Sequence, residues 1–380
     1  GVVILVAAIF FGIKQKPPTQ VSLVFWGLEN EEVYSQAIQT FKEKNSYISI
    51  EYVQKKPETY EKELLNAMAA AKGPDIFSLG HNWLPRYKDK ISAAPAGLIG
   101  LKDYYEAFVD VASFDFIADG SIWAVPLSVD TLALYWNKDI FNSAGIPEPP
   151  KTWDDFLSVV SALTLRDEQG NILRPGAALG ASGNISQAAD ILAMLMIQSG
   201  AEMTNKSKTQ ATFNAAASLN GSAYKPGETA LKFYTDFANP QRPVYTWHSR
   251  LAEPLILFSQ GKLAMMIDYA SALEEIKTLA PYLNFGVAPL PQIKDAETKV
   301  NYADYFGQAV WKKSKNAQYG WKFLAWLSQK DNAKIYLEAA KKPTSRRDLV
   351  VWQKSDPSLA VFAEQGLSAR SWYQADNEGI

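Results

Sequence analysis

The first part of the chain repeats one pattern of apolar and polar positions. Residues 21–25 place apolar side chains at every second position, as a strand does, and residues 30–41 place them at helical spacing. Residues 47–53 have the pattern of a second strand, 57–74 that of a helix ended by Gly-Pro, and 75–79 that of a third strand. A βαβαβ order with connections this short predicts a mostly parallel sheet with right-handed crossovers.

A second set of strand and helix patterns follows. Thr152-Trp-Asp-Asp155 has the capping-box pattern that opens a helix, and residues 204–225, rich in small and polar side chains, predict a surface insertion. Further strands are expected at Leu132–Asn137, Lys262–Ile267 and Phe285–Pro289, and further helices at Ser186–Gln198, Thr229–Ala238, Leu251–Gln260 and within 317–340. Because no low-complexity linker interrupts the pattern, we expect two domains joined by strand crossovers.

Aromatic and polar residues fall together after two of the predicted strands. Trp26, Glu29 and Asn30 follow the first strand, and Asn82 and Trp83 follow the third. Ligands of parallel α/β sheets bind beyond the carboxyl ends of the strands, so these positions are candidates for a binding site. Ordinary packing is the alternative for either tryptophan alone. The repetition of the arrangement at two strand ends favours a site.

Composition narrows the function further. A chain of 380 residues with 47% hydrophobic and 21% charged residues is typical of a soluble protein of two domains. The net charge of −2 offers no basic surface for nucleic acid. The absence of cysteine excludes thiolate zinc sites and cysteine nucleophiles, and two histidines leave little for a histidine-based metal cluster. We therefore expect no catalytic residue, no metal and no cofactor.

The N-terminus differs from the rest of the chain. Residues 1–13 are apolar or glycine, and Lys14, Lys16 and two prolines follow. Thirteen residues are too few to span a bilayer, which takes about 20. We interpret residues 1–16 as part of a signal peptide or membrane anchor, and favour an uncleaved anchor. A buried strand or helix is the alternative.

Several segments together resemble one family. They are GPDIF (73–77), VP (125–126), LYWNKDIF (134–141), PPKTWDDF (149–156), GKLAMM (261–266), FGVAPLP (285–291) and WKFLAWL (321–327). Each is weak alone, but their order over residues 21 to about 372 is similar to that of the extracellular solute-binding proteins of ABC importers, in the carbohydrate-binding group that includes maltose-binding protein.

The resemblance implies the two-lobed α/β fold of periplasmic binding proteins. Each lobe is then a mostly parallel sheet flanked by helices, and the ligand lies in the cleft between the lobes, which close by a hinge motion. The expected N-terminal lobe is 21–128 plus 273–311, and the expected C-terminal lobe is 129–272 plus 312–380.

The resemblance also implies ligand-binding residues beyond those at the two strand ends. At Tyr269-Ala-Ser271 this chain departs from the Gly and nearby Trp usual in relatives, which puts the stacking ring there in doubt. Trp247 and Tyr305 are weaker candidates because both could belong to the core. The full set is Trp26, Glu29, Asn30, Asn82, Trp83, Asp130, Asn184, Trp247, Asp268, Tyr269, Tyr305, Arg346 and Trp372.

These features fit a sugar, because carboxylates, amides and arginine engage hydroxyl groups while aromatic rings cover apolar C–H faces. We expect an extracytoplasmic, membrane-anchored monomer that captures a sugar or oligosaccharide and delivers it to the transmembrane subunits of an ABC permease. A polyamine, peptide or phosphorylated polyol is the alternative ligand. A glycoside hydrolase is a further alternative, and it would need two carboxyl groups about 5–9.5 Å apart across the scissile bond.

Overall fold

The computed structural model describes residues 20–219 and 222–374 of the chain. The expected N-terminal anchor over residues 1–16 lies outside the described residues. Among the helices of the described part, none combines the length and the apolar character that crossing a bilayer requires.

The first sheet is built on the βαβαβ unit that the apolar pattern predicts. Strand β1 (Val21–Gly27) lies between β2 (Ile48–Gln54) and β3 (Ile76–Gly80) and pairs in parallel with both. Helices α1 (Glu31–Lys44) and α2 (Pro57–Ala69) connect the three strands. Alternate side chains of β1 are buried, so a slip of one residue would expose the core face of the strand.

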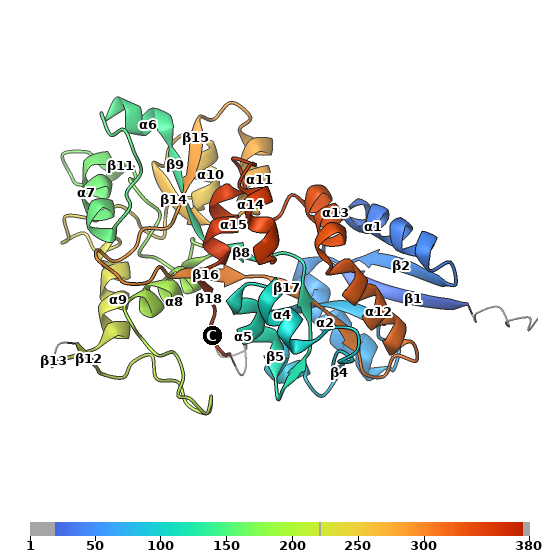
Figure 1. Cartoon of the computed structure of the whole chain (residues 1–380). Coiled ribbons are helices and arrows are strands. Elements are labelled where there is room, and N and C mark those ends of the chain that lie inside the picture. The colour runs from blue at the N-terminus through green and yellow to red at the C-terminus, as the bar shows by residue number, and fades with distance from the viewer. Residues whose placement is uncertain (1–19, 220–221, 375–380) are drawn as a thin grey trace, which may run out of the picture.

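A late part of the chain completes this sheet. Strand β17 (Phe306–Trp311) pairs antiparallel with β3, and the short strands β4 (Ile91–Ser92) and β7 (Val125–Pro126) pair antiparallel with β17. Helices α12 (Ala317–Leu327) and α13 (Lys330–Ala340) pack beside α1 on the same lobe (Figure 1).

The second sheet is antiparallel. Strand β9 (Ala133–Asn137) lies between β14 (Met265–Asp268) and β15 (Phe285–Ala288). The expectation of a mostly parallel sheet is therefore wrong for this lobe. Alternating strand and helix patterns do not show which strands pair, and both neighbours of β9 come from far later in the chain. The helices of this lobe are α6 (Lys138–Ser143), α7 (Trp153–Leu163), α8 (Ala188–Gln198), α9 (Pro226–Asp236), α10 (Pro254–Ser259) and α11 (Ala272–Leu279).

Shorter elements complete the fold. Part of the expected insertion at 204–225 forms the hairpin of β12 (Ala217–Leu219) and β13 (Ser222–Tyr224). The other short strands are β5 (Ile117–Ala118), β6 (Ser121–Ile122), β10 (Leu165–Arg166) and β11 (Ile172–Arg174). The other short helices are α3 (Leu84–Tyr87), α4 (Leu101–Ala107), α5 (Asp110–Phe116), η1 (Arg347–Leu349), α14 (Val350–Gln353) and α15 (Ala360–Gly366).

Two separate hydrophobic cores define two lobes. The first core draws mainly on residues 21–129 and 303–349, and the second mainly on 132–290. The core changes between Val129 and Leu132. The expected placement of 273–302 in the first lobe and of 312–349 in the second is wrong, because α11 and β15 pack on the second core whereas α12 and α13 pack on the first. An amphipathic pattern shows that an element has a core face, but it does not show which core receives it.

Three short strands lie between the lobes and carry the chain across. Strand β16 (Asn301–Asp304) pairs antiparallel with β8 (Asp130–Thr131) and parallel with β18 (Ala369–Arg370) (Figure 1). Within β16, Tyr302 belongs to the second core and Ala303 to the first. The ends of these crossover strands are therefore next to both lobes.

Candidate functional site

A cavity of about 190 Å³ lies where the two lobes and the crossover strands meet. Its lining combines carboxylates, hydroxyl groups and an ammonium group with aromatic rings. The first lobe provides Glu29, Ser128, Phe306 and Lys342, the second lobe Tyr269 and Ser271, and the crossovers Asp130, Asp304 and Tyr305, among others. Such a lining can bind hydroxyl groups by charge-assisted hydrogen bonds and can cover apolar C–H faces.

Glu29 reaches the cavity from the loop after β1. The Tyr52 hydroxyl donates a hydrogen bond of 2.7 Å to the Glu29 backbone oxygen and so holds this loop in place. Only glycine allows this approach, because a Cβ on Gly27 would lie 2.5 Å from the Tyr52 hydroxyl oxygen. The Glu29 carboxylate lies 2.5 Å from Lys342 Nζ, so the cavity wall has a paired positive and negative charge.

Asp130 joins the first crossover to the second lobe. Its Oδ1 accepts hydrogen bonds of 2.8 Å from the backbone N–H groups of Thr131 and Ala270, and its Oδ2 accepts one of 3.3 Å from Ser271. Desolvation raises the pKa of Asp130 to about 7, although these N–H donors and the charge of Lys342 favour the ionised form. The carboxyl group can therefore change its charge near neutral pH.

Tyr269 faces the cavity where relatives are expected to carry a different ring. Its hydroxyl donates a hydrogen bond of 2.8 Å to Asp190 on α8, and its backbone N–H donates one to Asp268. Asp268 is itself buried and is not part of the cavity lining. Burial raises its pKa to about 7, with the charge of Asp130 acting in the same direction. In this segment Tyr269 is a candidate for ligand contact, and Asp268 supports the turn that presents it.

Trp83 lines a second and larger cavity of about 950 Å³. The two cavities share lining residues that include Glu29, Ser271 and Lys342, so they are contiguous. The indole stacks between the rings of Tyr60 and Tyr87, with centroids 6.0 and 5.4 Å away. A Cβ on Gly80 would lie 2.7 Å from the Trp83 ring nitrogen, so glycine at the end of β3 permits this position.

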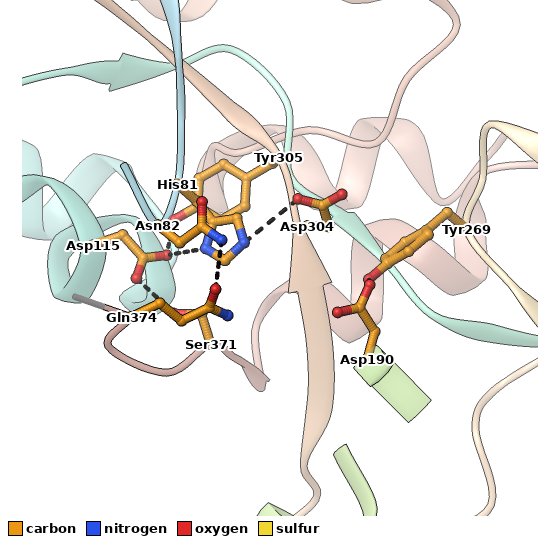
Figure 2. A network of polar contacts seen from close by, with 9 residues as sticks. All are labelled: His81, Asn82, Asp115, Asp190, Tyr269, Asp304, Tyr305, Ser371 and Gln374. Atoms are coloured by element: carbon orange, nitrogen blue, oxygen red, sulfur yellow. Dashed lines mark hydrogen bonds and ion pairs between the residues drawn. The ribbon is translucent and has the colours of Figure 1, made fainter. Parts of the chain in front are cut away.

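Tyr305 belongs to a buried polar network between the cavity and the first lobe (Figure 2). Its hydroxyl donates a hydrogen bond of 2.7 Å to Asp115 Oδ2, and the Ser371 hydroxyl donates one of 2.6 Å to Asp115 Oδ1. His81 lies against the Tyr305 ring, with centroids 5.4 Å apart and an interplanar angle of 14°. The His81 ring nitrogens face Asp115 on one side and Asp304 on the other.

Asn82 and Trp372 lie on the other side of this network. Both line a third cavity, of about 330 Å³, together with His81 and Asp115. The Asn82 amide donates a hydrogen bond of 2.9 Å to the Gln374 side chain (Figure 2). The structure therefore brings these two predicted residues together, but in a cavity separated from the first by the contact between His81 and Asp304.

The structure does not place Trp26 and Asn30 in these cavities. The Lys55 ammonium group covers the Trp26 ring at 3.7 Å from its centroid. Asn30 occupies the N-cap position of α1, but its side chain accepts a hydrogen bond from Gln54 instead of capping the helix. The expectation that Trp26 follows the first strand is wrong, because β1 continues to Gly27 and includes it. The pattern of residues also did not show the direction of either side chain.

Three further predicted residues have structural contacts away from the cavities beside the crossovers. Trp247 is fully buried in the second core and donates its ring N–H to Asn184 at 3.0 Å. The Asn184 amide donates in turn to the backbone oxygens of His248 and Leu251. Arg346 donates to the Ser328 backbone oxygen and forms an ion pair with Asp348 at 2.9 Å. These contacts occupy the polar groups that a ligand would need.

Within residues 20–219 and 222–374, no cluster of three or more His, Cys, Asp or Glu side chains has a geometry that could hold a metal ion.

The family follows from a match over most of the chain. Residues 27–334 match the bacterial extracellular solute-binding proteins, from the end of β1 into α13, and so include the second sheet, the strands of the first sheet after β1, and the crossovers β8 and β16. The chain belongs to this family.

The relatives of this solute-binding protein share its fold at low identity. A protein of Brucella abortus named as a binding protein is 25% identical over 271 residues, which are 71% of this chain and 62% of that protein, so the chain spans less than two thirds of its length. The maltodextrin-binding protein of Bacillus subtilis is 23% identical over 349 residues, or 88% of this chain and 77% of that one. The structure of the cyclic alpha-maltosyl-1,6-maltose binding protein of Arthrobacter globiformis matches with a TM-score of 0.76 at 20% identity, covering 93% of this chain and 88% of that one. This likeness shows the two-lobed fold.

Sequence reasoning missed several residues around the first cavity of this solute-binding protein. Lys342, Asp304 and Ser128 line it, and His81 contacts Asp304 behind it. His81 follows β3 directly, so the same strand-end argument that selected Asn82 and Trp83 could have included it. Lys342 carried no such signal, because its pairing with Glu29 joins positions 313 residues apart.

Proposed function

We propose that the chain is the extracytoplasmic substrate-binding component of an ABC transporter, and that it captures a sugar or oligosaccharide between its lobes. It would then deliver the sugar to the transmembrane subunits of the permease, as a monomer held at the membrane by its N-terminal segment. The family match supports a solute-binding role outside the cytoplasm. The membrane anchor rests on the apolar character of residues 1–13.

The observation that carries the choice of ligand is the lining of the two contiguous cavities. Carboxylates, a lysine and hydroxyl groups meet tyrosine, phenylalanine and tryptophan rings at the junction of the lobes. A sugar needs both kinds of contact, because its hydroxyl groups and its apolar faces are close together. The names of the Bacillus and Arthrobacter relatives, which refer to maltodextrin and to a cyclic maltosyl-maltose, support the same class of ligand.

A thermal-shift screen tests the proposal. Maltose, maltotriose, raffinose and mannobiose would be added to the full chain at increasing concentration, and we expect at least one to raise the melting temperature. At a sugar concentration 100 times the dissociation constant, binding stabilises the folded state by about 2.7 kcal/mol, which is a shift of several degrees. Spermidine, a tripeptide and glycerol 3-phosphate serve as competing ligands. A shift with one of these and with none of the sugars contradicts the proposed ligand class.

Two variants test whether the sugar that raises the melting temperature binds in these cavities. Lys342→Met removes the positive charge beside Glu29 and should reduce the sugar-induced shift, because Glu29 loses its partner and the ligand loses a donor. Lys341→Met, at the neighbouring exposed position, is the matched control and should bind as the unaltered chain does. Equal shifts in both variants would place the sugar elsewhere. Release of chromophore from chromogenic glycosides would instead support a hydrolase.

A further inference from the structure

His81 lies between two carboxylates at the boundary of the first cavity. It follows β3 and is only 4% exposed. Its Nδ1 lies 3.5 Å from Asp115 Oδ2, and its Nε2 lies 3.4 Å from Asp304 Oδ1 (Figure 2). At Nδ1 the distance is within ion-pair range but the geometry is not that of a hydrogen bond, so this buried nitrogen has no hydrogen-bond partner among the described residues.

The two carboxylates differ in how firmly they are held. Asp115 accepts hydrogen bonds from the hydroxyl groups of Tyr305 and Ser371. The backbone N–H of His81 donates a hydrogen bond of 3.0 Å to the backbone oxygen of Tyr305. This side of the network is therefore fixed. The Asp304 side chain is 54% exposed and lines the first cavity, and no residue in the described part of the chain donates a hydrogen bond to its carboxylate. His81 is the group that faces it.

The protonation state of His81 decides whether it can hold both carboxylates. A neutral imidazole has one N–H and one lone pair, so one ring nitrogen would repel the carboxylate it faces. Only the doubly protonated ring presents an N–H to Asp115 and to Asp304 at once. On deprotonation we expect the contact to Asp304 to be lost, because the buried Asp115 retains the remaining N–H whereas the exposed Asp304 can turn toward solvent.

We propose that His81 is a positioning residue of the sugar site: the doubly protonated ring holds the Asp304 carboxylate at the cavity wall, and deprotonation of the ring releases it. The proposal rests on the proposed function, since it assigns to Asp304 a contact with a sugar hydroxyl. His81 does not line the first cavity itself: it contacts two of the lining residues, Asp304 and Tyr305, and acts on the site through Asp304.

The charges around His81 give the direction of the pH dependence. Burial by itself lowers the pKa of His81, but the direct interaction with Asp115, and after it the charges of Asp115, Asp304 and Asp190, outweigh burial and raise the pKa above its ordinary value. The ring therefore stays charged up to a higher pH than a free histidine. The Asp304 carboxylate is held below that pKa and is released as the pH rises through it. The other charged groups near the ring, Lys88, Asp119 and Lys208, line the third cavity behind it.

A ring titration by NMR tests the contact without any ligand. The chain has two histidines, so a His248→Gln background leaves His81 as the single imidazole signal. We expect a pKa above the ordinary value of about 6.5 and a lower pKa in Asp304→Asn, because an attractive charge is removed. Asp154→Asn, at an exposed position on α7, is the control and should leave the titration unchanged. A His81 pKa that is the same with and without the Asp304 charge overturns the proposal.

Binding measurements then test the role in the site. The dissociation constant for the sugar that gives the largest thermal shift is measured between pH 5.5 and 8.5. We expect the affinity of the unaltered chain to fall about tenfold as His81 loses its proton, the usual effect of losing a hydrogen bond to a charged group. His81→Gln and Asp304→Asn should both lose this step, and the double variant should match either single one. An Asp130→Asn background removes the other cavity carboxyl that titrates near neutral pH, and its own affinity can differ; in that background the step should still be present with His81 and absent in His81→Gln.

The outcomes distinguish the two proposals. If the affinity of His81→Gln for the sugar still falls as the pH rises, the positioning role is contradicted and the sugar-binding function remains intact. Failure of every sugar to bind the unaltered chain at any pH contradicts the proposed function, and with it the role of His81 in binding. The ring titration gives its result in either case, because it needs no ligand.

Discussion

At the scale of single residues, Asp130 shows how the site and the stability of the protein are linked. Its carboxyl group is half-buried, and its pKa is raised to about 7 mainly by desolvation. In the unfolded chain an aspartate has a pKa of about 3.9. Between these two values the folded chain binds more protons at this position than the unfolded chain, so its contribution to stability falls as the pH rises.

Asp130→Asn should remove this contribution to the pH dependence. The amide oxygen can still accept from the backbone N–H groups of Thr131 and Ala270, but it carries no charge to desolvate. For each protein we compare the decrease in the free energy of unfolding between pH 5 and pH 8. We expect this decrease to be smaller in the variant than in the unaltered chain by on the order of 1–2 kcal/mol. Urea unfolding at the two pH values measures the difference. Asp154→Asn, an exposed control, should retain the full decrease, and the same decrease in Asp130→Asn would contradict the argument.

Four of the predicted ligand-binding residues that line the first two cavities share one property, which is their position shortly after a strand or at a crossover. Glu29, Trp83, Asp130 and Tyr269 all have it. Local patterns locate strand ends, so this part of the site can be predicted. Asn184 shows why the rest could not be: its polar groups are satisfied by partners more than 60 residues away, at Trp247, His248 and Leu251.

At the scale of elements, the start of α7 was predicted from its capping box. The Thr152 hydroxyl accepts a hydrogen bond of 3.1 Å from the Asp155 backbone N–H, and the Asp155 carboxylate accepts one of 3.2 Å from the Thr152 N–H. The signature is confined to four residues, so it needs no tertiary information. The apolar spacing also located α1 and α2, but α2 ends at Ala69, before the Gly73-Pro74 stop that the pattern predicts.

Thr152→Ala should destabilise the protein by about 1 kcal/mol, since one backbone N–H at the start of α7 loses its acceptor. The change lies away from the cavities described above, so the sugar-induced thermal shift should persist. Ser158→Ala on the exposed face of the same helix is the matched control. The Ser158 hydroxyl donates a hydrogen bond to the backbone oxygen of Asp154, an interaction that does not stabilise helices. We expect its loss to cause no measurable decrease in the free energy of unfolding. Urea unfolding compares the two, and equal stabilities would contradict the capping role.

Lobe membership of the late elements was the part of the fold that sequence patterns could not provide. Helices α12 and α13 have clear apolar faces, yet they follow a crossover and pack on the first core. Strand β9 has a clear strand pattern, yet its two partners arrive from after α10 and α11 and pair with it antiparallel. In both cases the missing information is the long-range pairing, which depends on complementary surfaces formed only in the folded chain.

At the scale of the whole molecule, the crossover strands join two cores that are otherwise separate. The lobes meet at β8, β16 and β18, and the first cavity lies beside this junction. Gln365 of α15 crosses the junction: its amide donates to Thr131 and Leu132, and its oxygen accepts from the backbone N–H of Leu290. Two lobes with separate cores, joined by only a few crossing segments, can close around a ligand by a hinge motion at those segments.

Closure can be measured directly because the chain has no cysteine. Glu43→Cys on α1 and Thr278→Cys on α11 place spin labels at exposed positions of different lobes. We expect the distance between them to shorten when the sugar that raises the melting temperature is added, since a sugar in the proposed site would contact both walls of the cavity. A pair within the first lobe, Glu43→Cys with Glu338→Cys, is the control and should not change. An unchanged distance between the lobes at saturating sugar would show that the ligand binds without closure.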